Sequence, residues 1–110
     1  MGLRIYISGP MSGKPDRNVV AFRHEAARLR ELGYMVVNPA EINVGTTDRA
    51  ECMKADLKRL LECDAVQLLP GYAESAGAWC ELMVARQIGL EVYEPQNRIE
   101  RKCPGAALRA

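Results

Sequence analysis

Residues 3–10 read LRIYISGP, a run of β-branched and aromatic residues that ends in a glycine and a proline. This composition is typical of a buried strand followed by a turn. Downstream, Phe22, Ala26 and Leu29 recur at the i, i+4, i+7 spacing of one helical face, and Gly33 follows as a helix stop. The pattern predicts a strand, a helix and a second strand over residues 3–8, 18–32 and 34–38.

The same alternation continues along the chain. Residues 46–48 (Thr-Thr-Asp) offer N-caps for a helix that runs to about Cys63, with Met53, Leu57, Leu60 and Leu61 as its apolar stripe. A strand over 64–69, a helix over 77–88 and a strand over 90–93 complete the series.

Strands that alternate with helices and are apolar almost throughout indicate a parallel sheet covered on both faces. We therefore expect an α/β, three-layer, flavodoxin-like or Rossmann-like fold with strand order 2-1-3-4 and helices on both faces. Residues 1–95 are expected to form this single domain, and residues 96–110 a polar, solvated C-terminal tail.

Composition narrows the function further. The chain has 110 residues and a formal net charge of +1, which provides no electrostatic footprint for nucleic acid. No apolar run approaches the length of about 20 residues that spans a membrane, and no signal-peptide pattern opens the chain. The four cysteines form no C-x-x-C pair, so we expect reduced thiols, no metal site and a cytoplasmic location. His24 lies on the polar face of its helix, together with Glu25, and is expected to be a surface residue.

Ligands of such sheets bind beyond the carboxyl ends of the strands, where the strand order reverses. In this chain that edge is built from the loops 8–15, 38–47 and 70–77. The glycines and hydroxyls of the loop 8–15 can bring backbone N–H groups to a phosphate or sugar, or can serve only to turn the chain. Residue types alone leave both readings open.

Three acidic residues are candidates for chemistry. Glu81 is expected in the first turns of its helix near the ligand edge, where it either faces solvent or enters a cleft. Asp56 borders the apolar stripe of its helix. Its carboxylate is expected either at the rim of the core or directed into a cleft. Asp64, at the amino end of its strand, is interpreted as a turn residue. Paired carboxylates are what glycosidic chemistry requires, one as nucleophile and one to manage the leaving group.

Several motifs together resemble a known family. They are IYISGPMSG at 5–13, NPAE at 38–41, Asp56-Leu57, DAV at 64–66, PG at 70–71 and Ser75-x-Gly77-Ala78-x-x-Glu81. In these residues the chain resembles a phage- and prophage-associated domain family of unassigned function. That family is related to nucleoside 2-deoxyribosyltransferases and deoxynucleoside 5′-monophosphate N-hydrolases.

The resemblance implies roles for particular residues. Glu81 matches the nucleophile that attacks the anomeric carbon, and Asp56 matches an acid that helps with the departing base or the sugar. Ser75 stands where the monophosphate hydrolases have a phosphate-contacting serine, and Gly77 is shared. Residues expected to line the sugar–phosphate end are Tyr6, Ser8, Gly9 and Ser12. The implied ligand is a nucleotide or nucleoside without a cofactor, and the implied assembly is a homodimer or larger.

Two residues depart from the relatives. Trp79 and Met83 replace glycines on either side of Glu81, where bulky side chains could narrow or fill the pocket. Trp79 is expected either in the core or as a lid on the base. The leading hypothesis is an enzyme that cleaves or exchanges an N-glycosidic bond. The alternative is a non-catalytic nucleotide-binding module of the same fold, with a purely structural protein ranked third.

Overall fold

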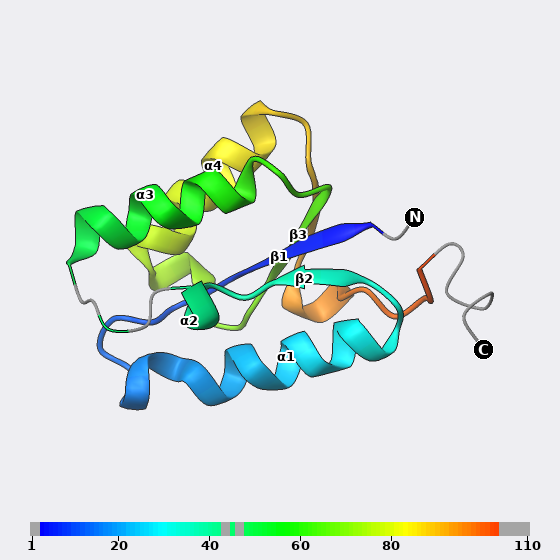
Figure 1. Ribbon diagram of the computed structural model, residues 1–110, viewed down its shortest axis with the longest axis horizontal. Helices are drawn as coiled ribbons and strands as arrows, with labels where there is room; N and C mark the ends of the chain where they lie inside the picture. Colours follow the sequence, from blue (N-terminus) through cyan, green and yellow to red (C-terminus); the bar gives the residue numbers. More distant parts are fainter. Residues whose placement is uncertain (1–2, 43–44, 46–47, 104–110) are drawn as a thin grey trace.

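The computed structural model describes residues 3–42, 45 and 48–103, and Figure 1 shows its sheet and helices. Within these residues a four-stranded sheet has the order β2-β1-β3-β4. Each neighbouring pair is parallel, so the predicted strand order and direction are confirmed. The strands are β1 (Arg4–Ser8), β2 (Met35–Val37), β3 (Ala65–Leu68) and β4 (Glu91–Tyr93).

The helices cover the two faces of this sheet. They are α1 (Val19–Glu31), α2 (Pro39–Ile42), α3 (Arg49–Leu60) and α4 (Ala76–Gln87), and short 3-10 turns lie at Pro15–Asn18, Tyr72–Glu74 and Pro95–Asn97. Figure 1 shows α1 on one side of the sheet and α3 with α4 on the other. None of the described helices is long and apolar enough to cross a membrane.

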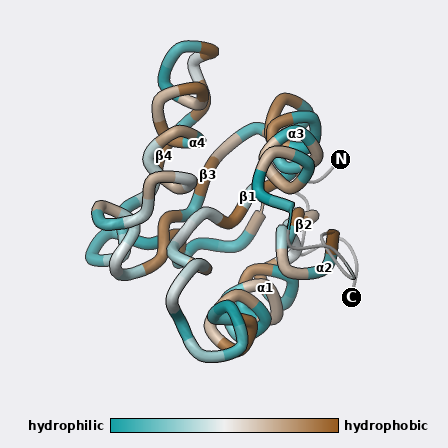
Figure 2. The backbone as a smooth tube through the Cα atoms, turned by 90° about the vertical axis from the view of Figure 1, so that its left-hand side faces the viewer, coloured by the Kyte–Doolittle hydropathy of each residue, from teal (hydrophilic) through white to brown (hydrophobic). Residues whose placement is uncertain are grey.

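Two cores follow from the alternation of side chains along β1. Ile5 and Ile7 point into the core that α1 covers, with Phe22 and Leu29 of that helix. Tyr6, between them in sequence, points to the opposite face and packs with α3 and α4 through residues such as Leu60 and Leu82. Successive residues of a strand face opposite sides, so this single strand contributes to both cores. Figure 2 shows apolar residues running through the strands at the centre of the fold.

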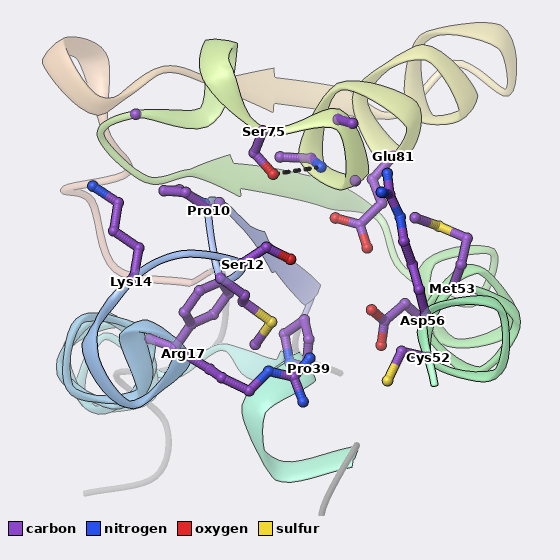
Figure 3. Close-up of a pocket in the computed structure, with 18 of the residues that line it drawn as sticks. Pro10, Ser12, Lys14, Arg17, Pro39, Cys52, Met53, Asp56, Ser75 and Glu81 are labelled. Carbon is purple, nitrogen blue, oxygen red and sulfur yellow. Dashed lines mark hydrogen bonds between the residues drawn. The ribbon is translucent and has the colours of Figure 1, made fainter. Parts of the chain in front are cut away.

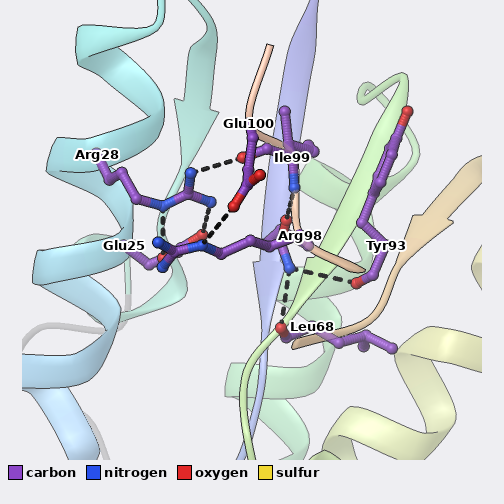
Figure 4. Close-up of polar contacts among 8 residues, drawn as sticks. Glu25, Arg28, Leu68, Tyr93, Arg98, Ile99 and Glu100 are labelled. Atoms are coloured by element: carbon purple, nitrogen blue, oxygen red, sulfur yellow. Dashed lines mark hydrogen bonds and ion pairs between the residues drawn. The ribbon is translucent and has the colours of Figure 1, made fainter. Parts of the chain in front are cut away.

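The segment after residue 95 differs from expectation. Instead of a solvated tail from residue 96, Ile99 and Cys103 are buried in the core on the α1 side. The buried Gln67 accepts a hydrogen bond from the Ile99 N–H at 3.0 Å, and Arg28 donates to the Ile99 carbonyl (Figure 4). This strap, residues 98–103, covers part of the sheet face beside α1. Residues 104–110 of the expected tail lie outside the described residues.

The strap also explains why Glu25 is buried rather than on the polar face of its helix. Arg28 is bound between the Ile99 carbonyl and the Glu25 carboxylate, with which it forms an ion pair. The sequence analysis placed Glu25 on the polar face, but Glu25 comes three residues after Phe22 and four before Leu29. It therefore borders their side of the helix, and that expectation was wrong. His24 is exposed, as expected.

Candidate functional site

A pocket with a volume of about 350 Å³ lies at the carboxyl ends of β1 and β3. Its walls come from the loops after these two strands and from the faces of α3 and α4. Parallel α/β sheets place their ligands at this edge, and the sequence analysis expected the site here. Thr46 and Thr47, in one of the expected loops, lie outside the described residues.

Glu81 occupies the second turn of α4 and is only 5% exposed, so the alternative of a solvent-facing glutamate is wrong. The Tyr6 hydroxyl donates a hydrogen bond to Oε2 of Glu81 at 2.7 Å, and the Ser8 hydroxyl donates to Oε1 at 2.7 Å. Tyr6 and Ser8 are two residues apart on β1 and therefore share the face that α4 covers. Both carboxylate oxygens are thus fixed by the central strand.

Burial raises the pKa of Glu81 to about 7. The hydrogen bonds from Ser8 and Tyr6 act in the opposite direction, since they favour the charged carboxylate, while the negative charge of Asp56 adds to the increase. Desolvation and the neighbouring acids likewise hold the pKa of Tyr6 well above its usual range, so its hydroxyl remains a donor. A carboxylate with a pKa near neutrality, fixed by two donors in a pocket, is typical of an active site.

Asp56 lies on α3 and is 7% exposed, with its side chain in the same pocket as Glu81 (Figure 3). The buried face of α3 is Cys52, Asp56 and Leu60, spaced by one turn each. The expected stripe included Leu61, which is 59% exposed, so that part of the prediction is wrong. The helix is rotated so that Asp56 faces the pocket. Of the two alternatives for Asp56, a charge at the rim of the core or one aimed into a cleft, the second is correct.

Ser75 and Gly77 form the start of α4 at the pocket wall. The Ser75 side chain accepts a hydrogen bond from the Ala78 N–H at 3.2 Å and so caps the helix. A serine hydroxyl that accepts in this way still has a proton to donate. Gly77 also lines the pocket, where an added Cβ would fit at an ordinary contact distance of 3.5 Å from the Met53 side chain.

Gly9 and Ser12 also line the pocket, and their place at the sugar–phosphate end stays a prediction. Gly9 is required for packing as well, because an added Cβ would lie 2.7 Å from the Leu69 Cβ. Tyr6 and Ser8 were expected to contact the sugar–phosphate end. In the structure their hydroxyls contact the Glu81 carboxylate, and neither residue is among those that line the pocket. Their contact with a substrate stays a prediction.

The two bulky residues that replace glycines of the related enzymes, Trp79 and Met83, leave the pocket open. Trp79 and Met83 are 46% and 40% exposed and are not among the residues that line the pocket. The inward face of α4 is formed by Ala78, Glu81 and Leu82, and residues 79 and 83 therefore project outward. Trp79 is neither in the core nor over the pocket in this structure.

Sequence reasoning missed three cationic residues at the pocket, Lys14, Arg17 and Arg49. Lys14 and Arg17 follow β1 in the loop that leads into α1. The signal that could have pointed to Arg17 is its flanking by Asp16 and Asn18, which tolerate unusual backbone conformations. Among the described residues, histidine, cysteine, aspartate and glutamate form no cluster that could hold a metal ion.

Comparison with solved structures shows that this fold is that of the 2-deoxyribosyltransferases. The enzyme from the psychrotolerant bacterium Bacillus psychrosaccharolyticus matches with a TM-score of 0.64 at 21% identity, over 89% of this chain and 77% of that chain. The 2-deoxyribosyltransferase from Leishmania mexicana matches with a TM-score of 0.67 at 19% identity, over 84% of this chain but only 63% of its own length.

The chain belongs to the family described as Domain of unknown function (DUF4406), whose model matches residues 3–94. No curated protein matches it. At these identities the solved structures show the fold and leave the activity to be inferred from the site.

Proposed function

We propose that the protein cleaves or exchanges the N-glycosidic bond of a deoxynucleoside 5′-monophosphate or deoxynucleoside, with Glu81 as the nucleophile. One observation carries the proposal. A buried carboxylate, held by two hydroxyl donors, faces a second carboxylate, that of Asp56, in a pocket of about 350 Å³. This volume lies within the range of small-molecule sites.

The chemistry would proceed by double displacement. Glu81 attacks C1′ of the deoxyribose, the bond from C1′ to the base breaks, and its electron pair leaves with the base. Tyr6 and Ser8 hold the carboxylate in position, and Asp56 helps with the departing base or the sugar. Water, or a second base, then attacks the glycosyl-enzyme at C1′ and releases Glu81. Two displacements give net retention of configuration.

The phosphate would bind at the other end of the pocket. Figure 3 shows Lys14 on the side away from Asp56, with Ser12 and Ser75 between Lys14 and the two carboxylates. Lys14 supplies a positive charge, Ser12 and Ser75 supply hydroxyl donors, and the N-terminus of the twelve-residue α4 adds its positive dipole. Glu74 also lines the pocket and partly offsets that charge.

A panel of deoxynucleoside 5′-monophosphates should release free base, and the corresponding deoxynucleosides should react more slowly. Replacing Ser75 with aspartate isolates the phosphate contact, because aspartate caps a helix as well as serine but repels a phosphate. We expect Ser75→Asp to raise KM for monophosphates by roughly fivefold or more and to change KM for deoxynucleosides little, since one exposed charge pair contributes about 1 kcal/mol or more.

The panel also separates the alternatives. If the protein binds nucleotides by calorimetry and releases no base, the non-catalytic binding module is the correct function. If it neither binds nor cleaves them, the similarity to the deoxyribosyltransferases extends only to the fold.

The expected homodimer, or larger assembly, also remains a proposal. Trp79 and Met83, one turn apart on α4, expose large apolar side chains that a second copy would cover. Sedimentation equilibrium at tens of micromolar protein should show a mass of at least two chains. A monomer throughout that range would contradict the assembly. The cytoplasmic location likewise remains a proposal, with four free cysteines in its favour.

A further inference from the structure

The turn that precedes α1 has an unusual backbone. Asp16, Arg17 and Asn18 all adopt left-handed conformations, with φ of 49°, 53° and 65°. Aspartate and asparagine are the residues other than glycine that tolerate this region best, whereas arginine is not favoured there. Strained non-glycine residues of this kind concentrate at ligand sites. A strained arginine flanked by two tolerant residues suggests that the side chain of Arg17 is needed where the turn places it.

Hydrogen bonds hold this turn against the end of β1. The Arg17 N–H donates to the Lys14 carbonyl at 3.0 Å, and the Asn18 side-chain amide donates to the Pro10 carbonyl at 2.9 Å. Arg17 lines the main pocket and also an adjoining cavity of about 160 Å³. Its side chain therefore lies at the boundary between the two spaces.

Arg17 and Glu81 lie on opposite sides of the pocket in Figure 3. In a displacement at C1′ the leaving group departs from the side opposite to the nucleophile. If Glu81 attacks, the base therefore leaves toward the side of the pocket that Arg17 lines. An ionised Asp56 can accept hydrogen bonds there but cannot stabilise a departing anion, whereas a guanidinium remains positively charged at every working pH.

We propose that Arg17 is a further catalytic residue, which binds the departing base and stabilises the negative charge that develops on it. This inference rests on the proposed function. As the bond from C1′ to nitrogen breaks, its electron pair moves into the base, and Arg17 donates hydrogen bonds to the ring and carbonyl acceptors that share the charge. The guanidinium keeps its proton, and the free base takes one from water after departure.

Glycine is the informative substitution, because it removes the side chain and is comfortable at positive φ. For Arg17→Gly we expect an unchanged or higher thermal midpoint and a fall of roughly 100-fold in kcat for base release from deoxyguanosine 5′-monophosphate. Release of 4-nitrophenolate from the 4-nitrophenyl glycoside of 2-deoxyribose 5-phosphate should fall by less than about threefold, because this leaving group is stable without assistance. Arg17→Lys keeps the positive charge but lacks the planar, forked donors of the guanidinium, and it should give an intermediate fall in kcat for base release.

Two controls accompany these variants. Lys14→Ala, in the same loop, should raise the KM for both substrates by the same factor, because both have the same phosphate. Arg23→Ala, exposed on α1 outside the pocket, should change neither. Equal losses of kcat on both substrates in Arg17→Gly would overturn the role of Arg17 and leave the proposed function standing. A wild-type protein that releases neither leaving group would overturn both.

Discussion

Replacing Glu81 with glutamine is expected to lower base release by at least about 10⁴-fold, because loss of a nucleophile removes the covalent pathway altogether. Glutamine has nearly the same shape, and its amide can still form hydrogen bonds with the hydroxyls of Tyr6 and Ser8. The variant should therefore fold and bind nucleotide. Single-turnover release of base, measured by chromatography, gives the rate, and calorimetry gives the affinity.

The matched control is Glu31→Gln, an exposed glutamate near the end of α1 and outside the pocket. This variant makes the same change from carboxylate to amide and should leave the rate of base release unchanged. A second readout is trapping of the glycosyl-enzyme, detected by mass spectrometry as an adduct on the peptide that contains Glu81. If Glu81→Gln retains a rate within tenfold of wild type, another group is the nucleophile.

The strand order was predictable because each strand is short, apolar and separated from the next by a helical pattern. Parallel strands require such crossovers, and right-handed crossovers leave few arrangements. The segments 3–8 and 64–69 contain β1 and β3, and the predicted ends differ from the observed ones by a residue or two. Local pattern was sufficient here because the core of an α/β sheet is formed by its continuous apolar strands.

The strap over residues 98–103 was not predictable in the same way. It has no helical or alternating period, and the side chains that fix it are Gln67 and Arg28, which come from β3 and α1. A glutamine inside an apolar strand is a buried polar group that needs partners. That requirement indicates that some segment must pair with Gln67, but it does not identify Ile99 as that segment.

The site was predicted in position and only partly in detail. The topology brought Glu81 and Asp56 to one sheet edge, and the structure places both in one pocket. The resemblance assigned Tyr6 and Ser8 to substrate, whereas their hydroxyls contact Glu81. The two-residue spacing on β1 puts both on one face, but whether that face meets substrate or α4 depends on helix packing. The left-handed turn at Arg17 depends on tertiary contacts as well.

The charge of Glu81 should also be visible in the stability of the fold. Its pKa is about 7 in the folded protein, whereas the ordinary value of 4.5 applies to the unfolded chain. Between pH 4.5 and 7 the folded state therefore holds a proton that the unfolded state has lost, and the free energy of unfolding falls as the pH rises. Above pH 7 the full difference corresponds to about 3 kcal/mol of lost stability.

Glu81→Gln removes this titration and should be more stable than wild type by about 3 kcal/mol at pH 8, with no difference at pH 4, where Glu81 is protonated in both states. Urea unfolding of both proteins at pH 4, 6 and 8 measures their free energies of unfolding. In the difference between the two free energies the contributions of the other titrating groups cancel, apart from the coupling of Glu81 to Asp56. If wild type were as stable as the variant at pH 8, the buried charge of Glu81 would not destabilise the fold, and this prediction would be wrong. In the same pH range kcat/KM should rise with pH, because only the carboxylate attacks C1′. The proton whose loss destabilises the fold is thus the one that must leave before Glu81 can react.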